Sequence, residues 1–337
     1  MRERFVILIL VLVNLTIGYA QKVIKSDLDT AFCIPGILGV PRSKGLIIKR
    51  ELLKDYRIKS KEISTGTITE SYISRNRRWE FKVRAPVVRE QNFIMALGLS
   101  YFVEEFQFEN PTSLTLPFHQ NLEDRSLKRL RGDLVIVKPT RGDIFYILRA
   151  RGALNGDYTS EIFGGDKSDF LKFSIAPLIG WKRNDYLSYG VGAALSYNFG
   201  KRSIFPIFSY NKTFNQHWGI ESILPAYAKL RYNTTDQKNY VYLSAELSGA
   251  NFSLYLDSDQ SDLIYLDKSE VRLLLIWERE IHDWLWVGVE SGYRKNISFD
   301  LANSANIDSS IIIDNSLTDA FVVSFSLFIV PPRDYFD

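Results

Sequence analysis

Two kinds of residue in this chain could carry chemistry, namely its histidines and a set of charged side chains that alternate with apolar ones. The histidines are His119, His217 and His282. Glu221 and Ser222 follow His217 closely, and Asp283 follows His282. A hydrolase needs a base, a nucleophile and an orienting group of these types within hydrogen-bond reach. Both histidines fall where hairpin turns are expected, and there histidine is simply a tolerated polar residue. We therefore expect a non-enzymatic protein, and a membrane-embedded hydrolase stays the alternative.

The charged residues occupy every second position of several apolar runs. In a β-strand, alternate side chains point to opposite faces, so these charges share the face opposite the apolar side chains. If the apolar face meets lipid, the charges line a lumen. The lumen candidates are Arg131, Asp133, Arg149, Arg151, Lys172, Glu221, Arg231, Glu246, Arg272 and Glu290. Their mixed signs predict ion pairs that fill a narrow lumen, and the alternative is a selectivity lining for a small anionic solute.

Three arginines should gather on the lumen face of adjacent strands: Arg131, Arg149 and Arg151. Each lies out of phase with its apolar neighbours. Asp133 is the nearest carboxylate, and one carboxylate cannot bind three guanidinium groups in the bidentate manner. Two outcomes follow: glutamates from elsewhere on the lumen wall, such as Glu80 or Glu246, complete the network, or an anion enters it.

The elements that must position these residues are long alternating strands. The runs Trp79–Val87 and Leu187–Phe199 alternate strictly between apolar and polar or small residues. Runs of ten to fourteen residues suit tilted membrane strands, and about twelve occur between residues 76 and 330. Short turn signals alternate with longer polar stretches. The pattern predicts an all-β fold, an antiparallel transmembrane outer-membrane β-barrel of about 12 strands. Its rival is a soluble exported β protein that binds a ligand.

Composition excludes several other classes. The chain of 337 residues has 42 basic and 39 acidic side chains, which argues against a nucleic-acid binder. Its single cysteine excludes an intrachain disulfide and paired-cysteine zinc sites. Because the chain has only three histidines, few side chains are suited to metal binding, and we expect no cofactor and no metal. Aromatic residues make up 14% of the chain, and those at strand ends are expected to form interfacial girdles.

The first residues predict export. Arg2 and Arg4 precede the apolar run Phe5–Val13, and small residues lead up to Ala20. This is the pattern of a cleaved signal peptide over residues 1–20. Residues 21–75 are expected to be an N-terminal extension, either a plug or a periplasmic segment, and residues 76–332 the barrel.

A resemblance sharpens this interpretation. Ser203–Tyr210 leads into Asn215–Ile220, Ile223–Pro225 and Leu230–Tyr232, with Tyr189–Ala194 upstream. This series resembles an uncharacterised family of outer-membrane β-barrels of Bacteroidota, a domain-of-unknown-function family. The resemblance covers roughly residues 76–330. It implies a porin-like single barrel surrounded by the lipid of a Gram-negative outer membrane, and it assigns no catalytic or ligand residue.

Overall fold

Strands dominate the computed structural model, which describes residues 36–90, 92–158, 168–255, 263–306 and 308–333. The strands are β1 (Leu46–Glu62), β2 (Ile68–Glu90), β3 (Phe93–Phe108), β4 (Leu127–Pro139), β5 (Ile144–Gly156), β6 (Leu171–Asn184), β7 (Leu187–Phe199), β8 (Lys201–Thr213), β9 (Trp218–Leu224), β10 (Tyr227–Asn233), β11 (Asn239–Tyr255), β12 (Leu263–His282), β13 (Leu285–Ala302), β14 (Ile311–Leu317) and β15 (Ala320–Ile329). The helices are α2 (Pro117–Asp124) and the 3₁₀ turns Pro111–Ser113 and Ser168–Phe170. The predicted signal peptide, residues 1–20, lies outside the described residues.

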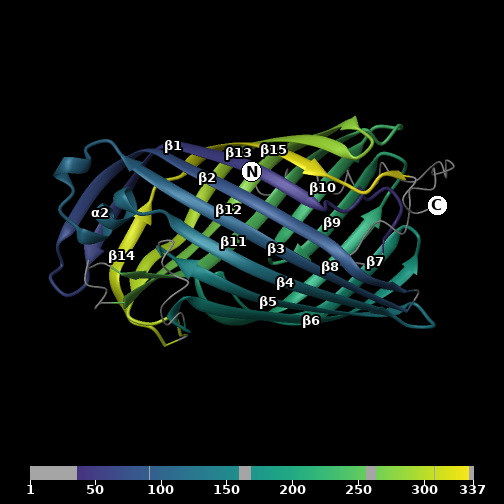
Figure 1. The fold of residues 1–337 in the computed structure, drawn as a ribbon, viewed down its shortest axis with the longest axis horizontal. Helices are drawn as coiled ribbons and strands as arrows, with labels where there is room; N and C mark the ends of the chain where they lie inside the picture. The colour runs from purple at the N-terminus through teal and green to yellow at the C-terminus, as the bar shows by residue number, and fades with distance from the viewer. Residues whose placement is uncertain (1–35, 91, 159–167, 256–262, 307, 334–337) are drawn as a thin grey trace, which may run out of the picture.

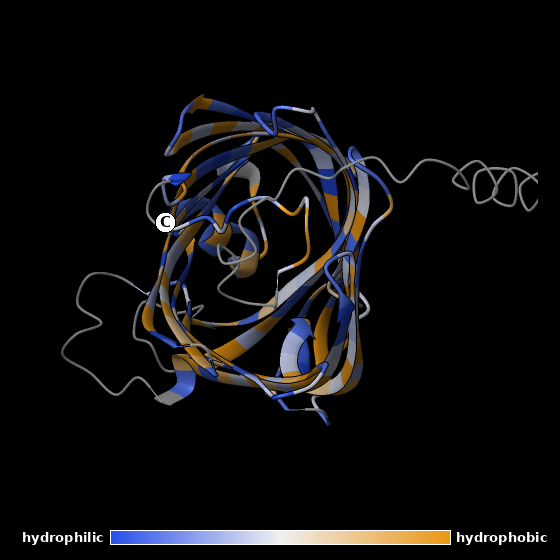
Figure 2. Ribbon diagram, turned by 90° about the vertical axis from the view of Figure 1, so that its right-hand side faces the viewer, coloured by the Kyte–Doolittle hydropathy of each residue, from blue (hydrophilic) through white to orange (hydrophobic). Residues whose placement is uncertain are grey.

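These strands close into an antiparallel barrel. From β1 to β13, each strand pairs with the next along the chain. The ring closes through β1, which pairs with β15 over Leu46–Leu53 and with β14 over Ile58–Glu62. On their other side β14 and β15 both pair with β13, so they share one position and the barrel has fourteen strand positions. Figure 2 shows the closed ring of strands, viewed along the long axis of the barrel.

The barrel therefore has more strands than the predicted twelve, for two local reasons. First, β1 is a barrel strand, so the barrel begins at Leu46 and not at residue 76. The left-handed residue Asp55 (φ 57°) interrupts the period-two pattern of β1 and hides the strand in the sequence. Second, the run from Trp218 to Arg231 is a hairpin of two short strands that turns at Pro225–Ala226.

The two ends of the barrel differ. At the terminal end lie residues 36–45, residues 330–333 and the short turns after β2, β4, β6, β8, β10 and β12. At the other end, the loop end, lie α2 and the last residues of β3, β5, β11 and β13. In Figure 1 the loop end is on the left and the terminal end on the right. Short turns at one end and long connections at the other are typical of outer-membrane barrels.

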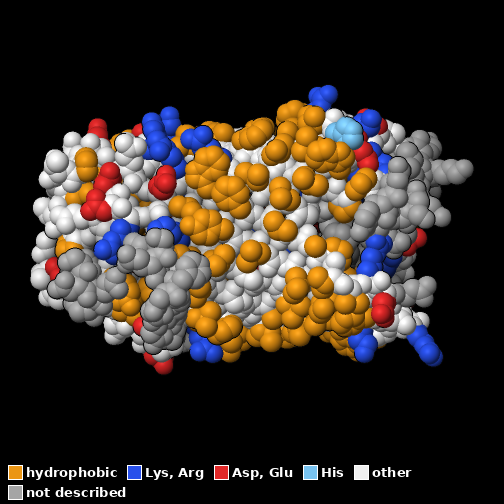
Figure 3. Space-filling view, in the orientation of Figure 1, with side chains coloured by type: hydrophobic (Ala, Val, Ile, Leu, Met, Phe, Trp, Pro, Cys, Tyr) orange, Lys and Arg blue, Asp and Glu red, His pale blue; other side chains and the backbone are white. Residues whose placement is uncertain are grey.

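An apolar band surrounds the middle of the barrel, with charged side chains toward both ends (Figure 3). Its outward side chains are large and exposed, among them Phe81, Leu99, Phe173, Val191, Ile204, Leu243, Leu273 and Phe325. Exposed aromatic residues lie near the terminal end, including Trp218, Tyr232, Trp277 and Trp284. Such a band, with aromatic residues at its edge, matches the surface that a barrel presents to a bilayer. No helix in the described residues is long and apolar enough to cross a membrane.

At the loop end the two faces exchange their character. The outward positions of β1 become charged, as at Lys54 and Arg57, while Leu53, Tyr56 and Ile58 point inward and are buried. These inward residues belong to one apolar core built from β1–β4, β11–β15 and α2. The short helix α2 starts at Pro117, a residue favoured in the first helical turn. Its Phe118 and Leu122 are fully buried, so α2 closes the loop end from within.

His119 is buried inside this core, with both ring nitrogens on serine hydroxyls. Its Nε2 lies 2.9 Å from Ser60 Oγ, and its Nδ1 lies 3.0 Å from Ser71 Oγ. Ser60 donates its own proton to Asn315 Oδ1, so Ser60 Oγ accepts from Nε2–H and Nδ1 accepts from Ser71. Burial lowers the pKa of His119 to about 4. The imidazole is therefore neutral at physiological pH.

The assignment of faces predicts opposite tolerances for a new charge. Phe325, 54% exposed in the apolar band, should not accept arginine, because a charge near the bilayer midplane costs about 2–4 kcal/mol. Phe325→Leu should assemble normally. Ser248→Arg places the same charge beside the luminal carboxylate Glu270 and should assemble far better than Phe325→Arg. Urea unfolding in vesicles and heat-modifiable gel migration measure both, and equal losses for the two arginine variants would contradict the assignment.

The burial of His119 predicts a pH dependence of stability. The pKa of His119 lies below its ordinary value in the folded chain, so between about pH 6.5 and pH 4 only the unfolded chain takes up this proton. The free energy of unfolding should therefore fall as the pH drops through that range, by up to about 3 kcal/mol from this group. His119→Gln keeps a donor and an acceptor and cannot titrate, so its pH dependence should be shallower. Urea unfolding in micelles at several pH values compares the two, and identical slopes would refute the assignment.

Candidate functional site

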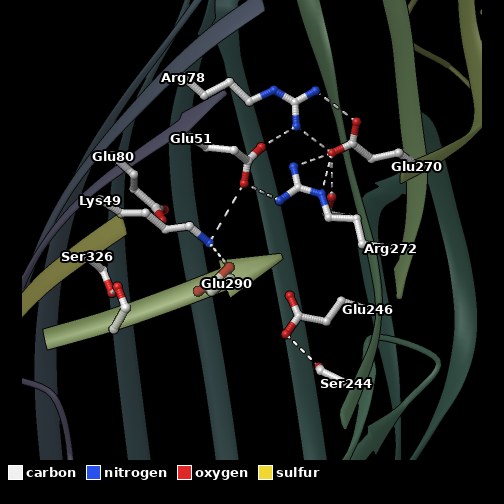
Figure 4. Close-up of polar contacts among 12 residues, drawn as sticks. Lys49, Glu51, Arg78, Glu80, Ser244, Glu246, Glu270, Arg272, Glu290 and Ser326 are labelled. Carbon is white, nitrogen blue, oxygen red and sulfur yellow. Dashed lines mark hydrogen bonds and ion pairs between the residues drawn. The ribbon is translucent and has the colours of Figure 1, made fainter. Parts of the chain in front are cut away.

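The middle of the lumen is crossed by a network of buried ion pairs centred on Arg78 of β2. Its Nη1 lies 2.9 Å from Glu51 Oε1 of β1 and 2.8 Å from Glu270 Oε1 of β12. Its Nε lies 2.8 Å from Glu104 Oε1 of β3. The Arg78 side chain is 5% exposed, and none of the three carboxylates exceeds 4%. Figure 4 shows Arg78 facing Glu270 across the lumen.

Two predicted lumen residues belong to this network. Arg272 Nη1 lies 2.8 Å from Glu51 Oε2, and Arg272 also contacts Glu270. Glu290 Oε2 lies 2.5 Å from Lys49 Nζ. The sequence analysis missed Lys49 and Glu51, because it assigned them to an extension. It also omitted Arg78, although the alternation at Trp79–Val87, continued one residue back, places Arg78 on the lumen face.

A second set of pairs lies on β9–β11. Lys229 Nζ lies 3.0 Å from Glu246 Oε1, and Arg231 Nε lies 3.2 Å from Glu221 Oε1. The predicted lumen residues Glu221, Arg231 and Glu246 do point inward, where each pairs with a side chain of opposite charge. Lys172 is separate from them: its Nζ lies 2.6 Å from Asp169 O and 3.0 Å from Ser253 Oγ, toward the loop end. Lys172 therefore joins β6 to β11 and lies apart from the arginines.

The predicted arginine cluster does form, around Asp133. Arg151 Nε lies 2.7 Å from Asp133 Oδ1, and Arg131 Nε lies 3.0 Å from Oδ2. Arg149 Nε lies farther away, 3.8 Å from Oδ1. The strand register explains this geometry, because Asp133 of β4 lies directly opposite Arg151 of β5. The Asp133 side chain is 2% exposed, whereas the three arginines are 17–29% exposed.

The structure also shows where the carboxylates named as possible partners lie. Glu80 Oε1 is 3.1 Å from Lys82 Nζ, and Glu246 Oε1 is 3.0 Å from Lys229 Nζ. Within the described residues neither glutamate makes an ion pair with Arg131, Arg149 or Arg151. Two guanidinium groups, those of Arg131 and Arg151, therefore share the single carboxylate of Asp133 at hydrogen-bond distance.

A cavity of about 210 Å³ lies in the lumen beside the network centred on Arg78. Charged side chains from opposite walls line it, including Arg129, Glu246 and Arg272. Arg129 stacks over the Phe102 ring at 4.8 Å, and its buried Nε has no hydrogen-bond partner among the described residues. At roughly 30 Å³ per water, the cavity has room for several water molecules or one small solute.

The segment before β1 crosses the lumen at the terminal end. Leu38 N donates to Asp185 O of the β6–β7 turn, 2.7 Å away. Gly39 has a φ of +81°, and a side chain there would meet Arg231 Nη1 at 3.0 Å. On the opposite side of the mouth, Arg42 Nη1 lies 3.2 Å from Asp283 Oδ1 of the β12–β13 turn. Residues 36–45 thus obstruct this mouth, while the rest of the predicted plug, residues 21–35, lies outside the described chain.

The three histidines do not come together. His119 is in the loop-end core, whereas His217 Nδ1 lies 2.8 Å from Asn233 O at the terminal end. The residues near His217 have other partners, because Glu221 pairs with Arg231 and Ser222 donates to Tyr210 O. In the part of the chain that the structure describes, no group of three or more His, Cys, Asp or Glu residues could hold a metal ion.

Comparisons with known proteins give likenesses among solved structures only. No family model and no curated protein matches the chain. The toluene transporter TodX of Pseudomonas putida is 9% identical, with a TM-score of 0.36 over 85% of this chain and 89% of that one. A FadL homologue of Pseudomonas aeruginosa is 9% identical, with a TM-score of 0.34 over 86% and 91%. The outer membrane protease OmpT of Escherichia coli is 9% identical, with a TM-score of 0.28 over 85% and 96%. At these TM-scores the likenesses carry no argument about function.

Proposed function

We propose that this chain is a non-enzymatic protein of the outer membrane of a Gram-negative bacterium, and that its barrel is a narrow channel for a small anionic solute. An even number of strand positions and an apolar outer band support the location, because bacterial outer-membrane barrels share both features. The surrounding partner is then the lipid of that membrane.

The sharing of one carboxylate by two arginines carries the proposal. Arg131 and Arg151 both contact the buried carboxylate of Asp133, and Glu80 nearby is paired with Lys82. Like charges at such distances repel one another unless an anion compensates them. An anionic solute gains from this excess, whereas the balanced pairs around Arg78 and Lys229 offer it little. The cluster therefore favours anions over cations of similar size.

The closed ends make the channel narrow. The loop end is filled by the apolar core around α2, and residues 36–45 cross the terminal end. Passage through the barrel requires α2 to move. The expected conductance is therefore small. Loosening α2 by Phe118→Ser with Leu122→Ser should increase it, because both side chains are fully buried in the core.

Conductance across a planar bilayer tests the proposal. The protein with Arg149→Gln and Arg151→Gln should lose most of its preference for anions, since two of the three cluster charges are gone. The matched control is Arg57→Gln with Arg183→Gln, which removes the same net charge from exposed positions at the two ends. This control should keep the preference. If neither the natural protein nor the loosened α2 variant conducts, the channel is refuted and the barrel is structural.

A further inference from the structure

The arginine cluster is built in a specific way across four strands. Arg84, Gly98, Asp133 and Arg151 lie in one row on β2, β3, β4 and β5. Gly98 has no side chain, and a Cβ there would meet Asp133 Cβ at 3.4 Å and Arg84 Nε at 3.6 Å. The row therefore brings an arginine close to Asp133 from either side, across the space that Gly98 leaves.

Asp133 contacts the two nearest arginines through their Nε atoms. The distances are 3.0 Å from Arg131 Nε and 2.7 Å from Arg151 Nε. A guanidinium has five N–H donors, so an Nε contact leaves the four donors on the two terminal nitrogens. For Arg131 and Arg151 these terminal groups have no hydrogen-bond partner in the described structure. The Arg131 side chain is 17% exposed and the Arg151 side chain 25% exposed, and their terminal nitrogens point to the lumen.

The geometry of this arrangement selects a class of anion. Arg131 and Arg151 carry two positive charges against the one negative charge of Asp133. The two terminal nitrogens of a guanidinium group can donate to two oxygens side by side, so two such groups match an anion with several oxygens. A halide ion offers a single acceptor atom and uses few of these donors.

We infer that Arg131 and Arg151, positioned by Asp133, bind a tetrahedral oxyanion of the phosphate or sulfate type. The inference rests on the proposed anion channel and adds the chemical class of the solute. The oxyanion can be free inorganic phosphate or the phosphoryl group of a small ester. The cavity of about 210 Å³ reaches Arg129, two residues before Arg131 on β4, and offers room for the remainder of such an ester.

Isothermal titration calorimetry of the full chain in micelles tests this site, with phosphate, sulfate, glycerol phosphate, acetate and chloride as probes. Phosphate and sulfate should bind saturably and at least about tenfold more tightly than acetate or chloride. Arg131→Gln and Arg151→Gln should each weaken phosphate at least about tenfold, the loss expected for a charged hydrogen-bond partner. The control Arg57→Gln with Arg183→Gln should bind as the natural protein does. Glycerol phosphate binding more tightly than phosphate would indicate an ester as the natural solute.

Measuring binding at two pH values tests whether the charge of the anion affects its affinity, because the size of phosphate stays nearly the same. Phosphate carries more of its second charge at about pH 8 than at about pH 6, whereas sulfate is doubly charged at both. Phosphate should therefore bind more tightly at the higher pH, and sulfate should not. If acetate binds as well as phosphate while the channel still prefers anions, this inference fails and the proposed function stands. If the protein neither binds an anion nor conducts one, both fail.

Discussion

The guanidinium of Arg78 holds three carboxylates from three other strands, and the width of the lumen depends on that contact. Glu51 and Glu104 lie on the neighbouring strands, whereas Glu270 comes from the opposite wall. Removing one member of such a buried group leaves charge unpaired in a medium of low dielectric constant, which costs several kcal/mol. The two walls are therefore kept within side-chain reach of each other at mid-height, and only a narrow lumen is compatible with these pairs.

Charge is distributed unequally between the two walls of this narrow lumen. On β9–β13 and β1, lysines and arginines pair with glutamates, as in the pairs of Lys229 with Glu246 and Lys49 with Glu290. On β4 and β5, three arginines share Asp133. Paired groups stabilise the barrel and have little electrostatic potential to offer a solute. β4 and β5 thus place more arginines than carboxylates on one wall of the lumen.

The alternation of residues predicted which face of a strand meets lipid, but it could not predict which strands meet across the lumen. Arg131 and Arg151 were placed correctly on adjacent strands because that contact is local, within one hairpin. Arg78 and Glu270 are 192 positions apart, and no periodicity within a strand relates them. The exchange of faces at the loop end was also missed. There the outward positions become charged, and the inward positions become apolar and pack against Phe118 and Leu122 of α2.

The two closures of the barrel differ in what weakens them. At the loop end, apolar packing holds α2, and contacts between uncharged side chains are not subject to screening by salt. At the terminal end the contacts are ionic: Arg333 pairs with Glu280 and Asp283, and Arg42 pairs with Asp283 from residues 36–45. Although burial opposes it, the Arg333 backbone N–H and the charges of both arginines lower the pKa of Asp283. Because Arg333 is 41% exposed, salt screens these pairs. The terminal mouth, which leads to the arginine cluster, is therefore the closure that responds to ionic conditions.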